Sequence, residues 1–187
     1  MALFACVTAR SQDATLFGFT AGFNTLQFDL KQDPDFEFTP SLSLGILFYL
    51  PISEPWGLKL PLLLQSKGVT HHNIVEGSPA THCDCFSTVA LQPQLHYNIN
   101  LQQPDLLLGI FSGGQVGFVL NADLEYPQFD FAILAGTSFG FNTKSNNVYS
   151  LSIGYLIYPY TINTRYLEVT DNTINWHGVE ILLSYEF

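Results

Sequence analysis

The sequence predicts an all-β protein, an eight-stranded antiparallel up-and-down β-barrel that spans a membrane. Apolar and polar residues alternate in segment after segment, which is the pattern of strands with one apolar face. Charged residues make up only 12% of the chain, while 16 Phe and 9 Tyr residues raise its aromatic content. No run of about 18 consecutive apolar residues occurs, so a membrane-spanning helix is not expected. A closed barrel of strands that faces lipid agrees with all three observations.

Size and charge exclude several other classes of protein. A chain of 187 residues is enough for one domain. Its formal net charge is −10, and its six Lys and Arg residues are scattered along the sequence. Proteins that bind nucleic acid need a basic surface, so we expect no nucleic-acid partner.

The first residues resemble a targeting segment more than a part of the fold. Residues 1–8 form a short apolar run, and Ala9-Arg10-Ser11 before Gln12 has the small-x-small form of a cleavage site. No basic residue precedes the run, so a signal peptide would have a missing or mis-assigned start. We therefore expect residues 1–11 to be a signal-peptide remnant and residues 12–187 to form the barrel domain.

The first four predicted strands each alternate between a larger apolar face and a small or polar face. The first, 15–24, sets Phe against Gly, Thr and Asn, and the second, 41–50, sets Leu, Ile and Phe against Ser and Gly. The third, 56–65, places Trp and Leu opposite Gly, Lys, Pro and Gln. The fourth, 88–97, places Val, Leu and Tyr opposite Thr, Gln and His, after a predicted long loop at 68–86.

The remaining strands continue the pattern with one irregularity. The fifth, 106–120, alternates cleanly only as far as Ile110, because Gly113-Gly114 allows a bulge that leaves the facing of its second half open. The sixth, seventh and eighth strands alternate throughout, apart from Leu182, and span 129–142, 149–157 and 176–187.

The connections support an even-numbered barrel. Long and short connections alternate, so all long loops fall at one end and all short turns fall with both termini at the other. The long loops lie near Lys31, His71, Asp123 and Tyr166, and the short turns near Ser53, Gln102 and Ser145. Pro61 and Pro93 are unusual inside paired strands, where a local bulge would accommodate each of them.

The end of the chain resembles a known assembly signal. Phe187 is the terminal residue, and Tyr185 lies two residues earlier on the same face of the last strand. This ending resembles the C-terminal signal of bacterial outer-membrane β-barrels. The resemblance implies the outer membrane of a Gram-negative bacterium, with membrane lipid and the barrel-assembly machinery as partners.

Four segments resemble the PorT-like outer-membrane β-barrel family. They are Ser41–Gly45 leading into Leu60–Gly68, Val89–Pro93, Asp130–Gly136 and the last strand, and the family carries a proline at the position of Pro93. The resemblance implies a small outer-membrane barrel. It also allows a protein partner in an envelope complex and a role in secretion, as for the family's namesake.

Polar residues on the inner face form the first candidate site. An eight-stranded barrel has an interior just wide enough for side chains, so we expect a hydrogen-bonded plug in preference to a pore. The predicted network comprises Lys59, Gln65, Gln92, Gln94, His96, Asp130, Glu180 and Glu186.

Histidines and cysteines in the loop at 68–86 form a second, weaker candidate. Such side chains bind zinc or copper, but the Cys-x-Cys spacing matches no common structural zinc pattern. We therefore expect no metal and no cofactor, and interpret the segment as a surface loop or as a redox pair, Cys83 and Cys85. The weak metal candidates are His71, His72, His82, Cys83 and Cys85.

No arrangement of residues predicts catalysis. Barrel lipases that act on lipid A share a His-x-Ser pair, whereas His96 and His177 are followed two residues later by Asn98 and Val179. We expect a non-enzymatic integral barrel with a structural, surface-binding or envelope-complex role. The alternative is a soluble lipocalin-like barrel that binds a small apolar ligand inside.

Overall fold

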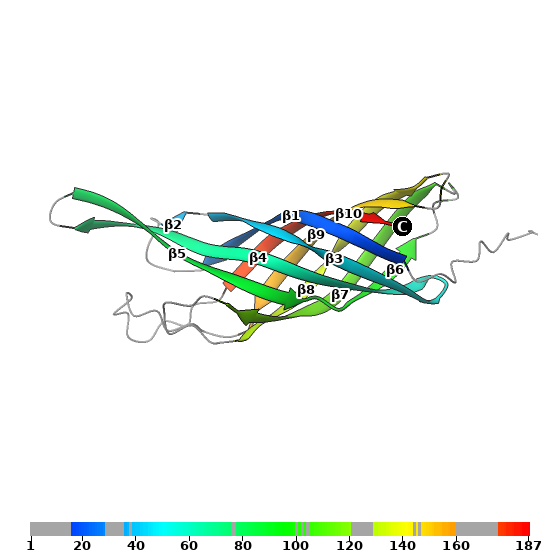
Figure 1. Ribbon diagram of the computed structural model, residues 1–187, viewed down its shortest axis with the longest axis horizontal. Coiled ribbons are helices and arrows are strands. Elements are labelled where there is room, and N and C mark those ends of the chain that lie inside the picture. Colours follow the sequence, from blue (N-terminus) through cyan, green and yellow to red (C-terminus); the bar gives the residue numbers. More distant parts are fainter. Residues whose placement is uncertain are drawn as a thin grey trace, which may run out of the picture.

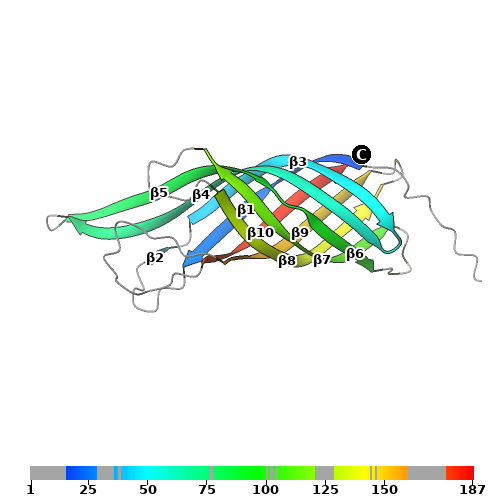
Figure 2. The same cartoon turned by 90° about the horizontal axis from the view of Figure 1, so that it is seen from below.

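The computed structural model consists of strands that wrap around one axis (Figures 1 and 2). It describes residues 16–28, 36–37, 39–75, 78–99, 101, 103, 105–120, 129–143, 145, 147–159 and 176–187. Within these ranges, no helix is long and apolar enough to cross a membrane. The strands are β1 (Leu16–Phe28), β2 (Phe36–Glu37), β3 (Thr39–Ser53), β4 (Trp56–Val75), β5 (Ser78–Leu91), β6 (Gln94–Ile99), β7 (Leu106–Val119), β8 (Phe129–Asn142), β9 (Val148–Tyr158) and β10 (Trp176–Glu186).

The sheet closes on itself through its first and last long strands. β1 pairs antiparallel with β10 from Gly18↔Glu186 to Phe28↔Trp176, and β3 pairs with the other edge of β1. β5 and β6 both pair with β4 on one side and β7 on the other, so they count as one interrupted barrel strand. The predicted eight-stranded antiparallel barrel is confirmed, with β2 as a short addition that pairs with β4.

The faces of the strands have the polarity of a membrane barrel. Outward side chains are apolar and exposed, as at Leu44 and Leu183, which are 57% and 63% exposed. Inward side chains are mostly polar and buried, as at Ser43 and Glu180. A soluble ligand-carrying barrel needs the opposite arrangement, so the lipocalin-like alternative is wrong. Lipid is the environment that stabilises such an outer surface.

The facing of β7, which the sequence leaves open, is regular. Phe111, Gln115 and Val119 point inward and are buried, whereas Ile110 and Val116 are exposed. The pairing of β7 with β8 is unbroken from Leu106↔Phe141 to Phe118↔Phe129. The two glycines therefore interrupt the pattern of side-chain sizes and leave the alternation of faces intact.

The described pairings contain no bulge at either proline. β4 keeps one register past Pro61, and its pairing with β5 continues into β6 without a shift across Pro93. The Gln92 backbone N–H donates to the Pro61 carbonyl oxygen at 2.9 Å, and the Gly114 N–H donates to that of Pro93 at 3.2 Å. A Cβ atom on Gly113 would collide with the Pro93 carbonyl, so glycine permits this close approach of β7.

The segment predicted as a long loop at 68–86 is instead a β-hairpin. β4 and β5 remain paired from Lys67↔Phe86 to Val75↔Ser78, and the two strands project well beyond the rest of the barrel (Figures 1 and 2). A two-stranded ribbon that leaves the wall has no core face to cover. Its sequence therefore lacks the apolar alternation that indicates a wall strand.

The two ends of the barrel differ. The turn between β3 and β4, which contains Glu54 and Pro55, lies at the same end as the C-terminus, and the β4–β5 hairpin projects from the opposite end (Figure 1). We name these the turn end and the hairpin end.

Candidate functional site: the polar network of the barrel lumen

The structure places all eight residues of the predicted inward network in the lumen. Seven of them are no more than 4% exposed, and the side chain of Lys59 is 12% exposed. They come from four barrel strands, β4, the interrupted strand β5/β6, β8 and β10, because the period of two brings every second residue of each strand to the interior. The seven are Gln65, Gln92, Gln94, His96, Asp130, Glu180 and Glu186.

An ion pair near the turn end forms one cluster. Lys59 Nζ lies 2.6 Å from Glu186 Oε1, and the Ser150 hydroxyl donates to the same oxygen at 3.3 Å. Lys59 also lies over the Tyr49 ring, with Nζ 5.9 Å from its centroid, and the Asn98 amide donates to the Tyr49 hydroxyl at 3.3 Å. The cluster ties β4 to β3, β6, β9 and β10 across the interior.

A second ion pair lies deeper, on the hairpin-end side of the first. Lys67 forms an ion pair with Asp130, and its ammonium group donates to the Tyr158 hydroxyl at 3.1 Å. The Gln115 amide donates to the Asp130 carboxylate at 2.6 Å. Both charged side chains are almost completely buried, so their interaction is far less screened than that of a surface pair.

Gln92 connects this cluster to the third lumen carboxylate. Its amide nitrogen donates to Gln115 Oε1 at 2.8 Å and to both oxygens of Glu180 at 3.1 Å. Gln65 donates to Glu180 from another side at 2.9 Å. Gln92 therefore bridges the carboxylates of Asp130, through Gln115, and of Glu180.

The chain of amides continues to His96. The Gln94 amide donates to Gln92 Oε1 at 3.2 Å, and Gln94 Oε1 lies 3.0 Å from His96 Nε2. The His96 ring stacks on the Phe111 ring with centroids 4.9 Å apart. His96 thus belongs to the packed interior and has the surroundings of a structural histidine.

Apolar side chains separate the two ionic clusters along the strands. Leu63 lies between Lys59 and Gln65 on β4, and Leu182 lies between Glu180 and Glu186 on β10. Both leucines are buried. The exception in the alternation of the last strand, Leu182, is therefore a filler of the lumen.

The contacts of these side chains fill the interior. Lys67, Gln65, Gln92 and Gln115 are each at most 1% exposed, so these four side chains are packed away from water. Among the buried side-chain atoms that the structure describes, Gln65 Oε1, Asn24 Oδ1 and Thr88 Oγ1 have no hydrogen-bond partner. The ion pairs and amide contacts given above connect the other members of the network, and such connected contacts at low dielectric are rigid. The arrangement can hold the barrel closed and resist passage of solutes.

Three members of the network lie outside the predicted set. Lys67 lies just beyond the predicted end of the third strand at residue 65, Gln115 lies where the sequence leaves the facing open, and Tyr158 follows the predicted end of its strand. Each lies an even number of residues from an inward position or an odd number from an outward one. Extending the alternation by one or two residues assigns Lys67 and Tyr158 to the interior, and continuing it past the two glycines for five residues from Ile110 assigns Gln115.

The weak metal candidates lie outside the described side chains. The backbone register pairs His71 with His82 and Thr70 with Cys83 across the β4–β5 hairpin. Among the side chains that the structure describes, no group of three or more His, Cys, Asp or Glu residues could hold a metal ion.

The proposed assembly signal lies at the seam of the barrel. Phe187 and Phe17 exchange backbone N–H to carbonyl hydrogen bonds of 2.8 and 3.2 Å. The Phe187 ring lies 5.6 Å from the Phe17 ring and 5.8 Å from the Tyr185 ring. The last residue therefore completes the pairing that joins the two ends of the sheet.

Comparisons with known structures give the same architecture. The crystal structure of the outer membrane protein OprG from Pseudomonas aeruginosa has a TM-score of 0.58 and 13% identity, with 94% of this chain and 97% of that chain covered. Neisserial surface protein A, NspA, has a TM-score of 0.54 and 12% identity, with 92% and 97% covered. Identities this low show the fold alone.

The family follows from the sequence model. No curated protein matches the chain. The model described as outer membrane protein beta-barrel domain matches residues 10–179, which is most of the sequence. The chain therefore belongs to the outer membrane protein β-barrel domain family and is a protein of the outer membrane.

Proposed function

We propose that this protein is a non-enzymatic, closed barrel that anchors a surface-binding hairpin in the outer membrane. The observation that carries the proposal is the β4–β5 hairpin, whose paired backbone continues beyond the barrel wall. A paired ribbon holds its residues in a defined arrangement, which favours specific contact with a partner. The orientation is part of the proposal, with the hairpin end outside the cell and the turn end in the periplasm.

The packed lumen supports an anchor over a channel. Lys59 and Lys67 are each paired with a carboxylate, and glutamine amides bond the third carboxylate, Glu180. A conducting path would require several of these buried contacts to break together. The same burial keeps a substrate away from the lumen side chains, which supports a non-enzymatic role.

The proposed partner is a protein of the cell envelope. The resemblance to the PorT-like family, with its link to secretion, favours this class of partner, and the assembly signal at Tyr185 and Phe187 favours insertion by the barrel-assembly machinery. Membership of the narrower PorT-like group remains a prediction.

Photo-crosslinking in intact cells tests the surface-binding role. A photoreactive residue at Ser78, near the tip of the hairpin, should give a discrete crosslinked product. The same residue at Ser53, at the turn end, is the matched control and should not give that product. If neither position yields a product, or both yield the same one, the hairpin is not the contact surface.

Electrical recording tests the closed lumen independently. The purified protein in a planar lipid bilayer should show no stepwise ion conductance. Regular conductance steps would favour the channel alternative, whatever the crosslinking shows.

A further inference from the structure

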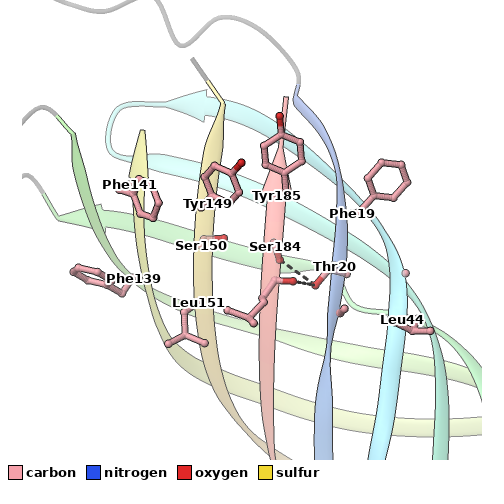
Figure 3. A pocket seen from close by; sticks show the side chains of 13 residues that line it. Phe19, Thr20, Leu44, Phe139, Phe141, Tyr149, Ser150, Leu151, Ser184 and Tyr185 are labelled. Atoms are coloured by element: carbon pink, nitrogen blue, oxygen red, sulfur yellow. Dashed lines mark hydrogen bonds between the residues drawn. The ribbon is translucent and has the colours of Figure 1, made fainter. Parts of the chain in front are cut away.

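The outer wall of the barrel carries a groove near the turn end. It has a volume of about 680 Å³, within the roughly 300–1,000 Å³ usual for small-molecule sites. It crosses five adjacent strands, β8, β9, β10, β1 and β3, and most of its lining side chains are apolar (Figure 3). We name it the wall groove, lined by Phe19, Ala21, Leu44, Phe139, Leu151 and Leu183 among others.

The wall groove passes over a small residue on β1. Ala21 points outward from β1, where its register partners are Leu183 on β10 and Leu44 on β3. Phe19 and Phe23 are the next outward residues on the same strand, and both are exposed. The Ala21 methyl group therefore leaves the wall groove open between Phe19, Leu183 and Leu44, which also line it.

An arc of aromatic rings borders the wall groove on the side of the turn end. The Phe141 and Tyr149 rings lie 5.3 Å apart, and the Tyr149 and Tyr185 rings lie 4.8 Å apart. Figure 3 shows Tyr149, Tyr185 and Phe19 in one row, with Leu151 and Leu44 further along the wall. The Asn147 amide donates to the Tyr185 hydroxyl at 2.6 Å, so the arc has a polar outer edge.

This arrangement matches the two parts of a membrane lipid. Aromatic belts with polar groups mark the level of the headgroups, and the apolar surface inside the belt faces hydrocarbon. The wall groove opens on the hydrocarbon side of the arc. A lipid chain can therefore lie in the hollow while its headgroup remains beside the Tyr149 and Tyr185 hydroxyls.

We propose that the wall groove binds one acyl chain of a phospholipid from the leaflet at the turn end. The apolar lining selects hydrocarbon, and the position of the aromatic arc selects a lipid of that leaflet. With the turn end in the periplasm, this leaflet is the inner one, which consists of phospholipid. The choice of phospholipid over lipopolysaccharide rests on the orientation given in the proposed function. The binding of an acyl chain in the wall groove does not depend on that orientation.

A variant that fills the wall groove distinguishes a specific lipid site from the general contact of the outer wall with lipid. Ala21→Phe places a ring in the wall groove without altering an inward residue. The matched control is Ala135→Phe, since Ala135 is also outward and exposed but lies on β8 outside the groove, opposite Tyr155. Each variant should show the same heat-dependent shift in gel mobility as the parent, which reports a folded barrel.

Native mass spectrometry measures the bound lipid. The parent protein in detergent, given phosphatidylethanolamine, should retain one lipid molecule when the detergent is stripped, and so should Ala135→Phe. Ala21→Phe should lose that adduct. Absence of a retained lipid from the parent, or equal retention by both variants, overturns the proposal.

The mass of lipid that copurifies with the protein from cells shows which class of lipid occupies the wall groove. A phospholipid mass supports the proposal, whereas a lipid A mass places the wall groove in the other leaflet and overturns it. A dimer that replaces the lipid adduct and disappears in Ala21→Phe would mean that a second copy of the chain covers the groove, which also overturns it. The crosslinking experiment at Ser78 does not depend on whether lipid occupies the wall groove. The two experiments therefore test the surface-binding role and the lipid site separately.

Discussion

Buried charge dominates the chemistry at the scale of single residues. Lys67 and Asp130 lie 63 residues apart in the sequence and meet in the lumen. Removing a charge from water is costly, and the pair is tolerated because each charge faces the other and Tyr158 and Gln115 add hydrogen bonds. Removal of only one partner would leave the other charge buried and unpaired, which should destabilise the barrel.

Lys67→Met should destabilise the barrel strongly. It leaves the Asp130 carboxylate buried without its lysine, for which the usual cost is about 3–5 kcal/mol in the free energy of unfolding. Denaturant unfolding in lipid vesicles, followed by tryptophan fluorescence, measures the loss. Lys59→Met is the control, because Lys59 reaches water and its loss should cost less. Equal losses would mean that burial does not decide the strength of these pairs.

The outward positions respond to charge in a different way. Arg at Leu62 or Ile153 would face the hydrocarbon, and we expect a loss of about 2–4 kcal/mol, the usual midplane cost in transmembrane barrels. Arg at Ser152, next to Ile153 but pointing inward, should depend on crowding and on its distance from the lumen carboxylates. Unfolding in lipid vesicles compares the three variants. A nearly neutral Leu62→Arg would contradict the assignment of the outer face to lipid.

Pairing decides structure at the scale of the strands. β4 and β5 remain paired beyond the wall although their sequence resembles a loop, and β5 continues into β6 across Pro93 without a change of register. Backbone hydrogen bonds between neighbouring strands stabilise both features, and these bonds do not depend on the polarity of the side chains.

The last strand is expected to depend on its terminal ring. Phe187→Ala keeps the two backbone hydrogen bonds with Phe17 but removes the ring, so it should lower the folded amount in the membrane and leave precursor in the periplasm. Immunoblotting of membrane and periplasmic fractions measures both species.

Phe48→Ala is the matched control for this experiment. Phe48 also packs on Phe17, with centroids 5.1 Å apart, but it lies inside the chain. If both variants reduce folding equally, Phe187 acts only as an interfacial anchor and is not an assembly signal.

At the scale of the whole molecule, the two ends of the barrel carry different features. The hairpin end carries the projecting ribbon, and the turn end carries the C-terminus, the aromatic arc and the wall groove (Figures 1 and 3). The orientation in the membrane therefore decides which partner each end meets.

Protease added to intact cells should cut only at the hairpin end. The expected sites are within residues 31–37, 68–86, 121–128 or 159–173, and within 68–86 we expect cleavage between Val75 and Ser78, since paired strands resist proteases. Mass spectrometry of the fragments locates the cuts. Cleavage at Ser53 or Ser145 in intact cells would reverse the orientation.

The sequence by itself determined the fold class and most of the lumen. The facing of a strand repeats every two residues, so local alternation alone assigns Lys59, Gln92 and Glu180 to the inward side, whatever their partners are. The same reasoning failed where the local pattern is weak. The polar hairpin has the composition of a loop, and the size change at Gly113-Gly114 resembles a bulge.

Only the tertiary structure decided which of these residues meet. Gln92 and Glu180 are 88 residues apart in the sequence. Ala21 lies in the wall groove beside Leu183 and Leu44 because the register of β1 with β10 and β3 places it there. Alternation gives the face of a residue but not its height along the barrel or its neighbour across it. Those depend on the register of every strand pair and on the closure of β1 against β10, which are properties of the whole sheet.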